Sequence, residues 1–176
     1  MSIKNIPHPT SERGELLRGA IEHRATWMGL LIDEAKKAGL DYGFAHNAVR
    51  RCGVFHGLTK QDNSGDLKKF AAAFANQDVK DVFEMDVFQS TDDELYINFH
   101  YCPLVAAWMK CGLPMSDLPE LCQIAMDGDR GIIDANVMHG YKFYLGETIA
   151  NGDGFCKIRI TKGKEYDPAT DAKANG

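Results

Sequence analysis

A cysteine and a histidine lie where a predicted strand meets a predicted helix. The run Phe99-His100-Tyr101-Cys102-Pro103-Leu104 ends an alternating segment and begins one of helical spacing. Proline favours the first position of a helix, so Cys102 should directly precede the first turn. Unpaired backbone N–H groups and the helix dipole favour a thiolate there, with a lowered thiol pKa. We interpret Cys102 as a candidate nucleophile; the alternative is a small residue packed beneath a helix start.

Two further cysteines and one histidine could join Cys102. His100 precedes it by two residues, so on a strand both side chains should share a face, as a base beside a nucleophile or as two metal ligands. Cys122 lies on the next predicted helix and Cys156 on the last strand. Together these four side chains could form a tetrahedral Zn²⁺ site, although their spacing matches none of the compact zinc motifs. Cys156 could equally be a core residue.

Aspartates lie close to these cysteines in the sequence. Asp129 follows Cys122 by seven residues and returns to its helix face, whereas Asp127 points about 140° away on a regular helix. Asp153 lies in the glycine-rich turn between the last two predicted strands. It could shape that turn through side-chain to backbone bonds. Alternatively, Asp153 could serve as an acid/base or substrate anchor at the mouth of the sheet.

Composition limits the function classes. The 176 residues are 44% hydrophobic and 26% charged, which is typical of one globular domain. A formal charge of −5 argues against nucleic acid as a partner. The apolar runs are far shorter than a membrane span, and no signal-peptide pattern is present, so we expect a cytoplasmic protein with no membrane partner. Five cysteines without CxxC pairs indicate reduced thiols, of which we interpret Cys52 and Cys111 as structural.

Apolar periodicity and turn residues predict the order of the elements. Residues 1–9 should form an arm and residues 56–65 a loop. Helices are predicted over about 11–37, 41–52, 66–74, 103–112 and 119–136, and strands over 82–89, 94–101, 141–148 and 155–162. The strands come as two hairpins.

This order predicts an α+β fold: an antiparallel sheet of about four strands with helices packed mainly on one face. We expect a single domain over residues 1–165 and a flexible tail over 166–176, which is rich in polar and small residues. The sequence leaves open a homo-oligomer that pairs through the long first helix.

Several motifs between residues 95 and 162 resemble the L-2-amino-thiazoline-4-carboxylic acid hydrolase family. They are Cys102-Pro103-Leu104 with Trp108, Gly112-Leu113-Pro114, Cys122 with Asp127, Thr148-Ile149-Ala150, Gly152-Asp153 and Cys156-Lys157-Ile158. The resemblance implies a cofactor-free hydrolase that opens a small cyclic amidine-like C–N substrate. For the member that names the family, this is conversion of a 2-aminothiazoline carboxylate to an N-carbamoyl cysteine.

The resemblance suggests a mechanism with two variants. The Cys102 thiolate would attack the amidine carbon, while Asp127 or Asp153 binds the amidine nitrogens and moves protons and His100 assists. Alternatively, a carboxylate would activate water directly and the cysteines would be structural. The Gly-Asp-x-x-Cys hairpin is also similar to vinyl-reductase-type small-molecule-binding domains, some of which hold zinc through cysteines. A sensor-like binding module with a cysteine-rich structural or zinc site is therefore the competing hypothesis.

Overall fold

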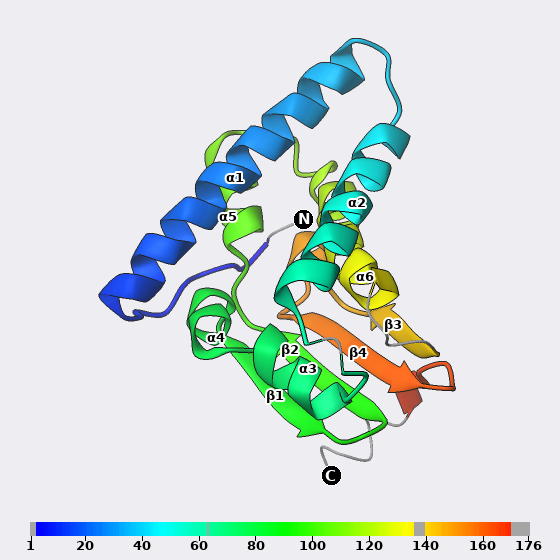
Figure 1. The fold of residues 1–176 in the computed structure, drawn as a ribbon. Coiled ribbons are helices and arrows are strands. Elements are labelled where there is room, and N and C mark those ends of the chain that lie inside the picture. The colour runs from blue at the N-terminus through cyan, green and yellow to red at the C-terminus, as the bar shows by residue number, and fades with distance from the viewer. Residues whose placement is uncertain (1–2, 63, 136–139, 170–176) are drawn as a thin grey trace.

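The protein is described from a computed structural model, over residues 3–62, 64–135 and 140–169. Helices and strands alternate in groups along the chain (Figure 1). The elements are α1 (Glu12–Lys37), α2 (Gly43–Lys60), α3 (Leu67–Phe74), α4 (Gln77–Phe83), β1 (Met85–Ser90), β2 (Glu94–Phe99), α5 (Pro103–Lys110), α6 (Leu118–Ala135), β3 (Tyr141–Leu145), the 3₁₀ turn η1 (Ile149–Asn151) and β4 (Cys156–Lys162).

The four strands form one antiparallel sheet in the order β1-β2-β4-β3. The register pairs Leu95 with Ile160, Ile97 with Ile158 and Phe99 with Cys156, so apolar side chains share one face. This face belongs to the same buried cluster as side chains from α3, α5 and α6. The predicted α+β fold with two hairpins is therefore confirmed.

The opposite face of the sheet carries a buried arginine. Arg159 is almost fully buried, and its guanidinium lies 4.7 Å from the ring centre of Phe88 and 5.1 Å from that of Tyr96. Tyr166 also packs on this group, with its ring edge-to-face against Tyr96. The predicted tail thus begins with a buried residue, while residues 170–176 lie outside the described part of the chain.

Helices α2 and α6 pack backbone against backbone. A Cβ built on Gly53 would lie 2.0 Å from the carbonyl oxygen of Gly128, and one on Gly131 would lie 2.2 Å from that of Arg50. The predicted end of the second helix at Cys52 was therefore wrong, and so was the first half of the predicted loop over 56–65, since residues 56–60 are helical. Gly53 and Gly57 continue α2 to Lys60, because their missing side chains allow α6 to approach.

The prediction of a strand over 82–89 also missed a helix. Asn76 caps α4 by accepting a hydrogen bond from the Val79 N–H at 3.2 Å. The helix ends at Phe83, its C-cap residue Glu84 has a left-handed φ of 48°, and β1 begins at Met85. The chain therefore reaches the sheet through a tight turn at Glu84.

Helix α1 has two apolar faces. Ala25, Gly29 and Ile32 are buried, and α1 packs on α5 and α4, whereas Leu16 and Trp27 on the opposite face are exposed. Exposed apolar stripes of this kind often mark interaction surfaces. The homo-oligomer through α1 stays a prediction. Among the described residues, no helix combines the length and apolar character that crossing a bilayer requires.

Candidate functional site

Cys102 lies at the N-terminus of α5, as predicted. It is the N-cap residue, with extended backbone, and Pro103 begins the helix. The Cys102 side chain makes no capping hydrogen bond, although the nearby backbone N–H groups of Val105 and Leu104 act to lower its pKa. Burial outweighs their effect and raises the pKa of the Cys102 thiol to about 11. The predicted lowering of this pKa was therefore wrong for the closed structure, because the helix start lies in the core.

The fold gathers Cys102, Cys122 and Cys156 into one buried group, which we call the thiol cluster. All three are at least nine-tenths buried, and each sulfur lies close enough to interact electrostatically with the others. Cys156 Sγ accepts a 3.3 Å hydrogen bond from the Ile149 N–H, and the nearby Thr148 hydroxyl acts to lower the pKa of Cys122. Burial raises the pKa of Cys122 to about 12 and that of Cys156 well above its ordinary value.

Asp153 lies beside this cluster and shapes the turn that holds it. Its Oδ2 accepts a 2.8 Å hydrogen bond from the Thr148 N–H, and its charge acts on Cys156. The Thr148 hydroxyl in turn caps η1. Asp153 therefore shapes the turn, which is one of the two roles left open by the sequence. Its role as an acid/base or substrate anchor stays a prediction.

Asp127 belongs to a different group, on the α2 side of α6. His46 bridges two carboxylates there, with Nδ1 2.7 Å from Asp127 and Nε2 2.9 Å from Glu120, and Arg130 donates to Asp127 at 2.8 Å. Burial would raise the pKa of Asp127, but the bonds from His46 and Arg130 outweigh it and lower this pKa. The bond to Glu120, with that to Asp127, raises the pKa of His46. Asp127 is thus an anion held by these ion pairs.

Asp129 is the acidic neighbour on the Cys122 side of α6. This half-buried carboxyl interacts electrostatically with Cys122, Arg24 and Arg130. Burial raises its pKa to about 7, against the lowering effect of the two arginines. Its seven-residue spacing from Cys122 was the signal for this position, because α6 stays regular through Gly128 and Gly131.

The raised pKa of Asp129 predicts how stability depends on pH. The folded state holds a proton that the unfolded carboxyl loses near pH 4, so stability falls as pH rises from about 4 to 7. Asp129→Asn should therefore increase the free energy of unfolding by about 2 kcal/mol at pH 8 and leave it unchanged at pH 4. Urea denaturation at both pH values measures this. Asp134→Asn, an exposed site on the same helix, is the control, and an equal gain at both pH values in Asp129→Asn would contradict the account.

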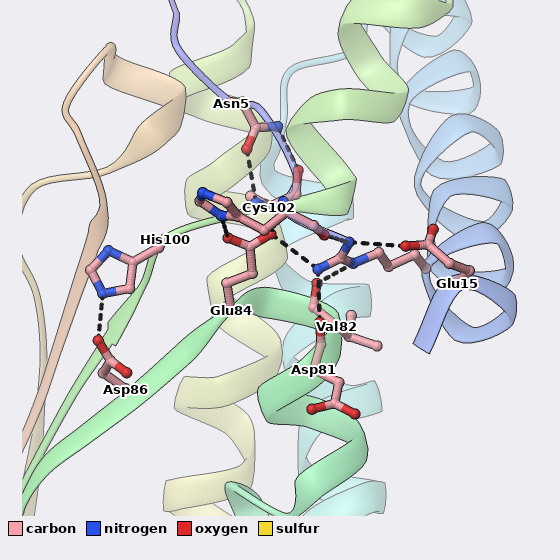
Figure 2. Close-up of polar contacts among 10 residues, drawn as sticks. Asn5, Glu15, Asp81, Val82, Glu84, Asp86, His100 and Cys102 are labelled. Carbon is pink, nitrogen blue, oxygen red and sulfur yellow. Dashed lines mark hydrogen bonds and ion pairs between the residues drawn. The ribbon is translucent and has the colours of Figure 1, made fainter. Parts of the chain in front are cut away.

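His100 does not join the thiol cluster. Strand β2 ends at Phe99, and the chain bends before entering α5, so the predicted shared face of His100 and Cys102 was wrong. The exposed His100 ring turns toward Asp86, with Nε2 2.9 Å from its carboxylate (Figure 2). The strand pattern could not show this, because the alternation of faces stops where the strand stops.

The N-terminal segment over residues 3–10, here called the arm, binds directly to Cys102. The side-chain amide of Asn5 donates to the Cys102 carbonyl at 2.8 Å and accepts from the Cys102 N–H at 2.9 Å (Figure 2). Ile3 is buried in the main core, and the His8 N–H donates to Glu84 at 2.6 Å. No sequence pattern indicated these contacts, since Asn5 and Cys102 are 97 residues apart.

Arg18 of α1 binds the backbone of the arm. Its buried guanidinium donates to the carbonyls of His8 at 2.8 Å, Asp81 at 2.9 Å and Val82 at 3.2 Å. It also lies 4.8 Å from the ring centre of Tyr101. One arginine of α1 thus joins the arm to the C-terminal carbonyls of α4.

Two hollows formed by the described residues lie away from the thiols. A shallow, open hollow of about 550 Å³ is lined by His8, Gln77, Lys80, Asp81, Glu84, Met85, Asp86 and His100. A second, of about 10 Å³, lies between α1 and α6 and holds no more than one water molecule. Neither hollow is lined by a thiol of the cluster, and all three of these side chains are buried, so the thiol cluster is closed to solvent.

The alternative zinc set does not fit the geometry. His100 lies apart from the three cysteines, as shown above. Within the described ranges, no three or more His, Cys, Asp or Glu side chains are arranged to hold a metal ion. We therefore derive no chemistry from a metal.

Comparison with known proteins places these features in a family. A family model described as L-2-amino-thiazoline-4-carboxylic acid hydrolase matches residues 18–160. The chain belongs to this family. The match spans α1 to β4 and so includes Cys102, Cys122, Asp153 and Cys156, and it confirms the resemblance noted in the sequence. Membership indicates a hydrolase-like function at the level of the family.

Solved structures add information about the fold alone. The chain is similar to the crystal structure of a trafficking protein particle complex subunit 3 from Naegleria fowleri covalently bound to palmitic acid, with a TM-score of 0.52. The two share 19% sequence identity, over 82% of this chain and 95% of that one. A search of curated proteins finds no match.

Proposed function

We propose that this protein hydrolyses a small cyclic amidine of the 2-aminothiazoline-4-carboxylate type, with Cys102 as nucleophile. Family membership supports the reaction class. The observation that carries the assignment to Cys102 is its position as the N-cap of α5, where the backbone N–H groups of Leu104 and Val105 act to lower the pKa of its thiol. Such donors stabilise a thiolate as soon as the competing burial is relieved.

The reaction balances with water as the only co-substrate. The Cys102 thiolate adds to the amidine carbon between nitrogen and sulfur, and the ring C–S bond of the tetrahedral adduct breaks. This releases the substrate's own thiol and leaves an isothiourea on Cys102. Water then adds to the same carbon, and the Cys102 thiolate departs. The product is an N-carbamoyl cysteine, and the enzyme regains its free thiolate.

Carboxylates beside the thiol cluster supply the proton transfers in this proposal. Asp129, with a pKa of about 7, can accept and return a proton near neutral pH. Asp153 is fixed by the Thr148 N–H and can pair with a protonated amidine nitrogen. We assign neither task to Asp127 or His100, because both are held in ion pairs elsewhere.

A small-molecule-binding module is the second candidate function. It is favoured by the high pKa of about 11 at Cys102, which leaves roughly one thiol in 10⁴ ionised at pH 7 in the closed conformation. A module of this kind would bind an amidine or a ureido compound and release it unchanged.

An assay for ring opening separates the two functions. The purified protein is incubated with 2-aminothiazoline-4-carboxylate, and N-carbamoyl cysteine is measured by mass spectrometry against a protein-free control. The hydrolase proposal expects multiple turnovers per protein molecule. Saturable substrate binding in calorimetry without product formation would instead support the binding module.

A further inference from the structure

Asn5 makes a paired contact with one residue of the thiol cluster. Its carboxamide uses one donor and one acceptor, and both meet the backbone of Cys102. The Cys102 carbonyl also accepts the 3.1 Å helix bond from Ala106, so the Asn5 contact does not replace a bond of α5. The Cys102 backbone is therefore a two-point receptor for a group with an N–H beside a C=O.

We propose that this receptor is a binding subsite for a ureido or amidine group, and that the arm is a strap in which Asn5 occupies the subsite until a ligand displaces it. The inference rests on the proposed function and deepens it. An amide, a neutral amidine and a ureido group each present an N–H donor and an acceptor nitrogen or oxygen on one carbon, so they can offer the same two-point pattern as Asn5. A ligand bound to the Cys102 backbone would contact the residue that also carries the proposed nucleophile.

The arm is held by a few separate contacts, as expected for a strap that can be released. Its contacts are spaced along the chain: Ile3 in the core, Asn5 on Cys102 and His8 on Glu84. Burial would raise the pKa of Glu84, but the bonds from His8 and the charge of Arg18 outweigh it, so this carboxyl holds the arm as an anion. The arm precedes α1 and belongs to no helix or strand, so it can leave without breaking one.

Thiol labelling tests whether the arm covers Cys102. The folded protein is treated with iodoacetamide, and the rate at each cysteine is measured by peptide mass spectrometry. Asn5→Ala removes both bonds and should raise the labelling rate of Cys102 about tenfold or more relative to that of Cys156. The exposed Cys52 is the internal reference for the reagent, and Asn47→Ala, at an exposed position of α2, is the control variant.

The ratio of the Cys102 labelling rate to the Cys156 labelling rate keeps the test valid even if Asn5→Ala lowers the free energy of unfolding. Global unfolding exposes Cys102 and Cys156 together, whereas release of the arm exposes Cys102 first. Asn5→Asp, which keeps the size of the side chain and loses the donor, should give the same direction of change. An unchanged ratio in both variants would overturn the strap.

Ligand binding tests the chemistry of the subsite. N-carbamoylglycine carries the ureido group, and succinate is a control of the same length without an N–H donor. In the unaltered protein the Asn5 side chain competes with a ligand for the subsite and weakens its apparent affinity. Asn5→Ala should therefore bind N-carbamoylglycine about tenfold more tightly than the unaltered protein does. Succinate should show no such difference. Equal affinity of both proteins for N-carbamoylglycine would overturn the subsite.

Neither experiment depends on catalysis. A raised labelling ratio and tighter ureido binding in a protein that fails to open the thiazoline ring would leave the strap standing and remove the proposed hydrolysis. Ring opening by a protein in which Asn5→Ala changes neither labelling nor affinity would support the proposed hydrolysis and overturn the strap.

Discussion

Replacing Cys102 with serine is expected to lower kcat/KM for thiazoline ring opening by about 10³-fold. A hydroxyl is far less acidic than a thiol, and no histidine or other base is hydrogen-bonded to this position among the described residues to activate it. Since the substitution changes one atom, the start of α5 should keep its conformation. The rate is measured by quantifying N-carbamoyl cysteine, and the fold by thermal unfolding.

Cys111→Ser is the matched control for this prediction. Cys111 lies at the other end of α5, is half-buried and is bonded to the Trp108 carbonyl, so its replacement should leave kcat/KM within about twofold. A Cys102→Ser variant that kept near-normal activity would exclude covalent catalysis. It would favour the alternative in which a carboxylate activates water and the cysteines are structural.

Gly53→Ala is expected to lower the free energy of unfolding by about 3 kcal/mol. The new Cβ would lie 2.0 Å from a backbone oxygen of α6, and backbone cannot rotate aside as a flexible side chain can. Helices α2 and α6 must therefore move apart along their shared length. Because domains of this size are stable by only about 5–15 kcal/mol, the loss is a large fraction. Urea denaturation measures it.

Gly19→Ala on α1 is the control, because nothing lies within 4 Å of its built Cβ. Alanine favours a helix over glycine, so this variant should gain up to about 1 kcal/mol. If Gly53→Ala behaved like Gly19→Ala, the close approach of α2 and α6 would be contradicted.

The fold class followed from local patterns, but some element ends did not. Alternation and turn residues were sufficient for the two hairpins, since strand pairing in a hairpin depends on neighbouring segments. Gly53 favoured a helix end at Cys52 and Gly57 favoured a loop from residue 56, because a glycine either interrupts a helix or lets another backbone approach. Only α6, some 70 residues later in the chain, decides between these two roles. Helix α4 was missed because Val82 and its neighbours also fit a strand.

The residues of the candidate site could be predicted where the position of a side chain on a helix or strand determines its neighbours. Cys102, Cys122 and Cys156 lie together because the α5 start, the inner face of α6 and the first residue of β4 meet in the core. The pKa of these thiols was not predictable, because burial depends on what covers them. Asn5 was missed for the same reason: a contact across 97 residues leaves no mark on local spacing.

The most direct test of the account is to look for the covalent bond to Cys102. Protein mixed with excess 2-aminothiazoline-4-carboxylate is quenched in acid within milliseconds to seconds and examined by intact-protein and peptide mass spectrometry. Covalent catalysis predicts a transient species heavier by one substrate molecule, with the added mass on Cys102 and absent from Cys102→Ser. Continued turnover with no added mass at any time point would contradict it.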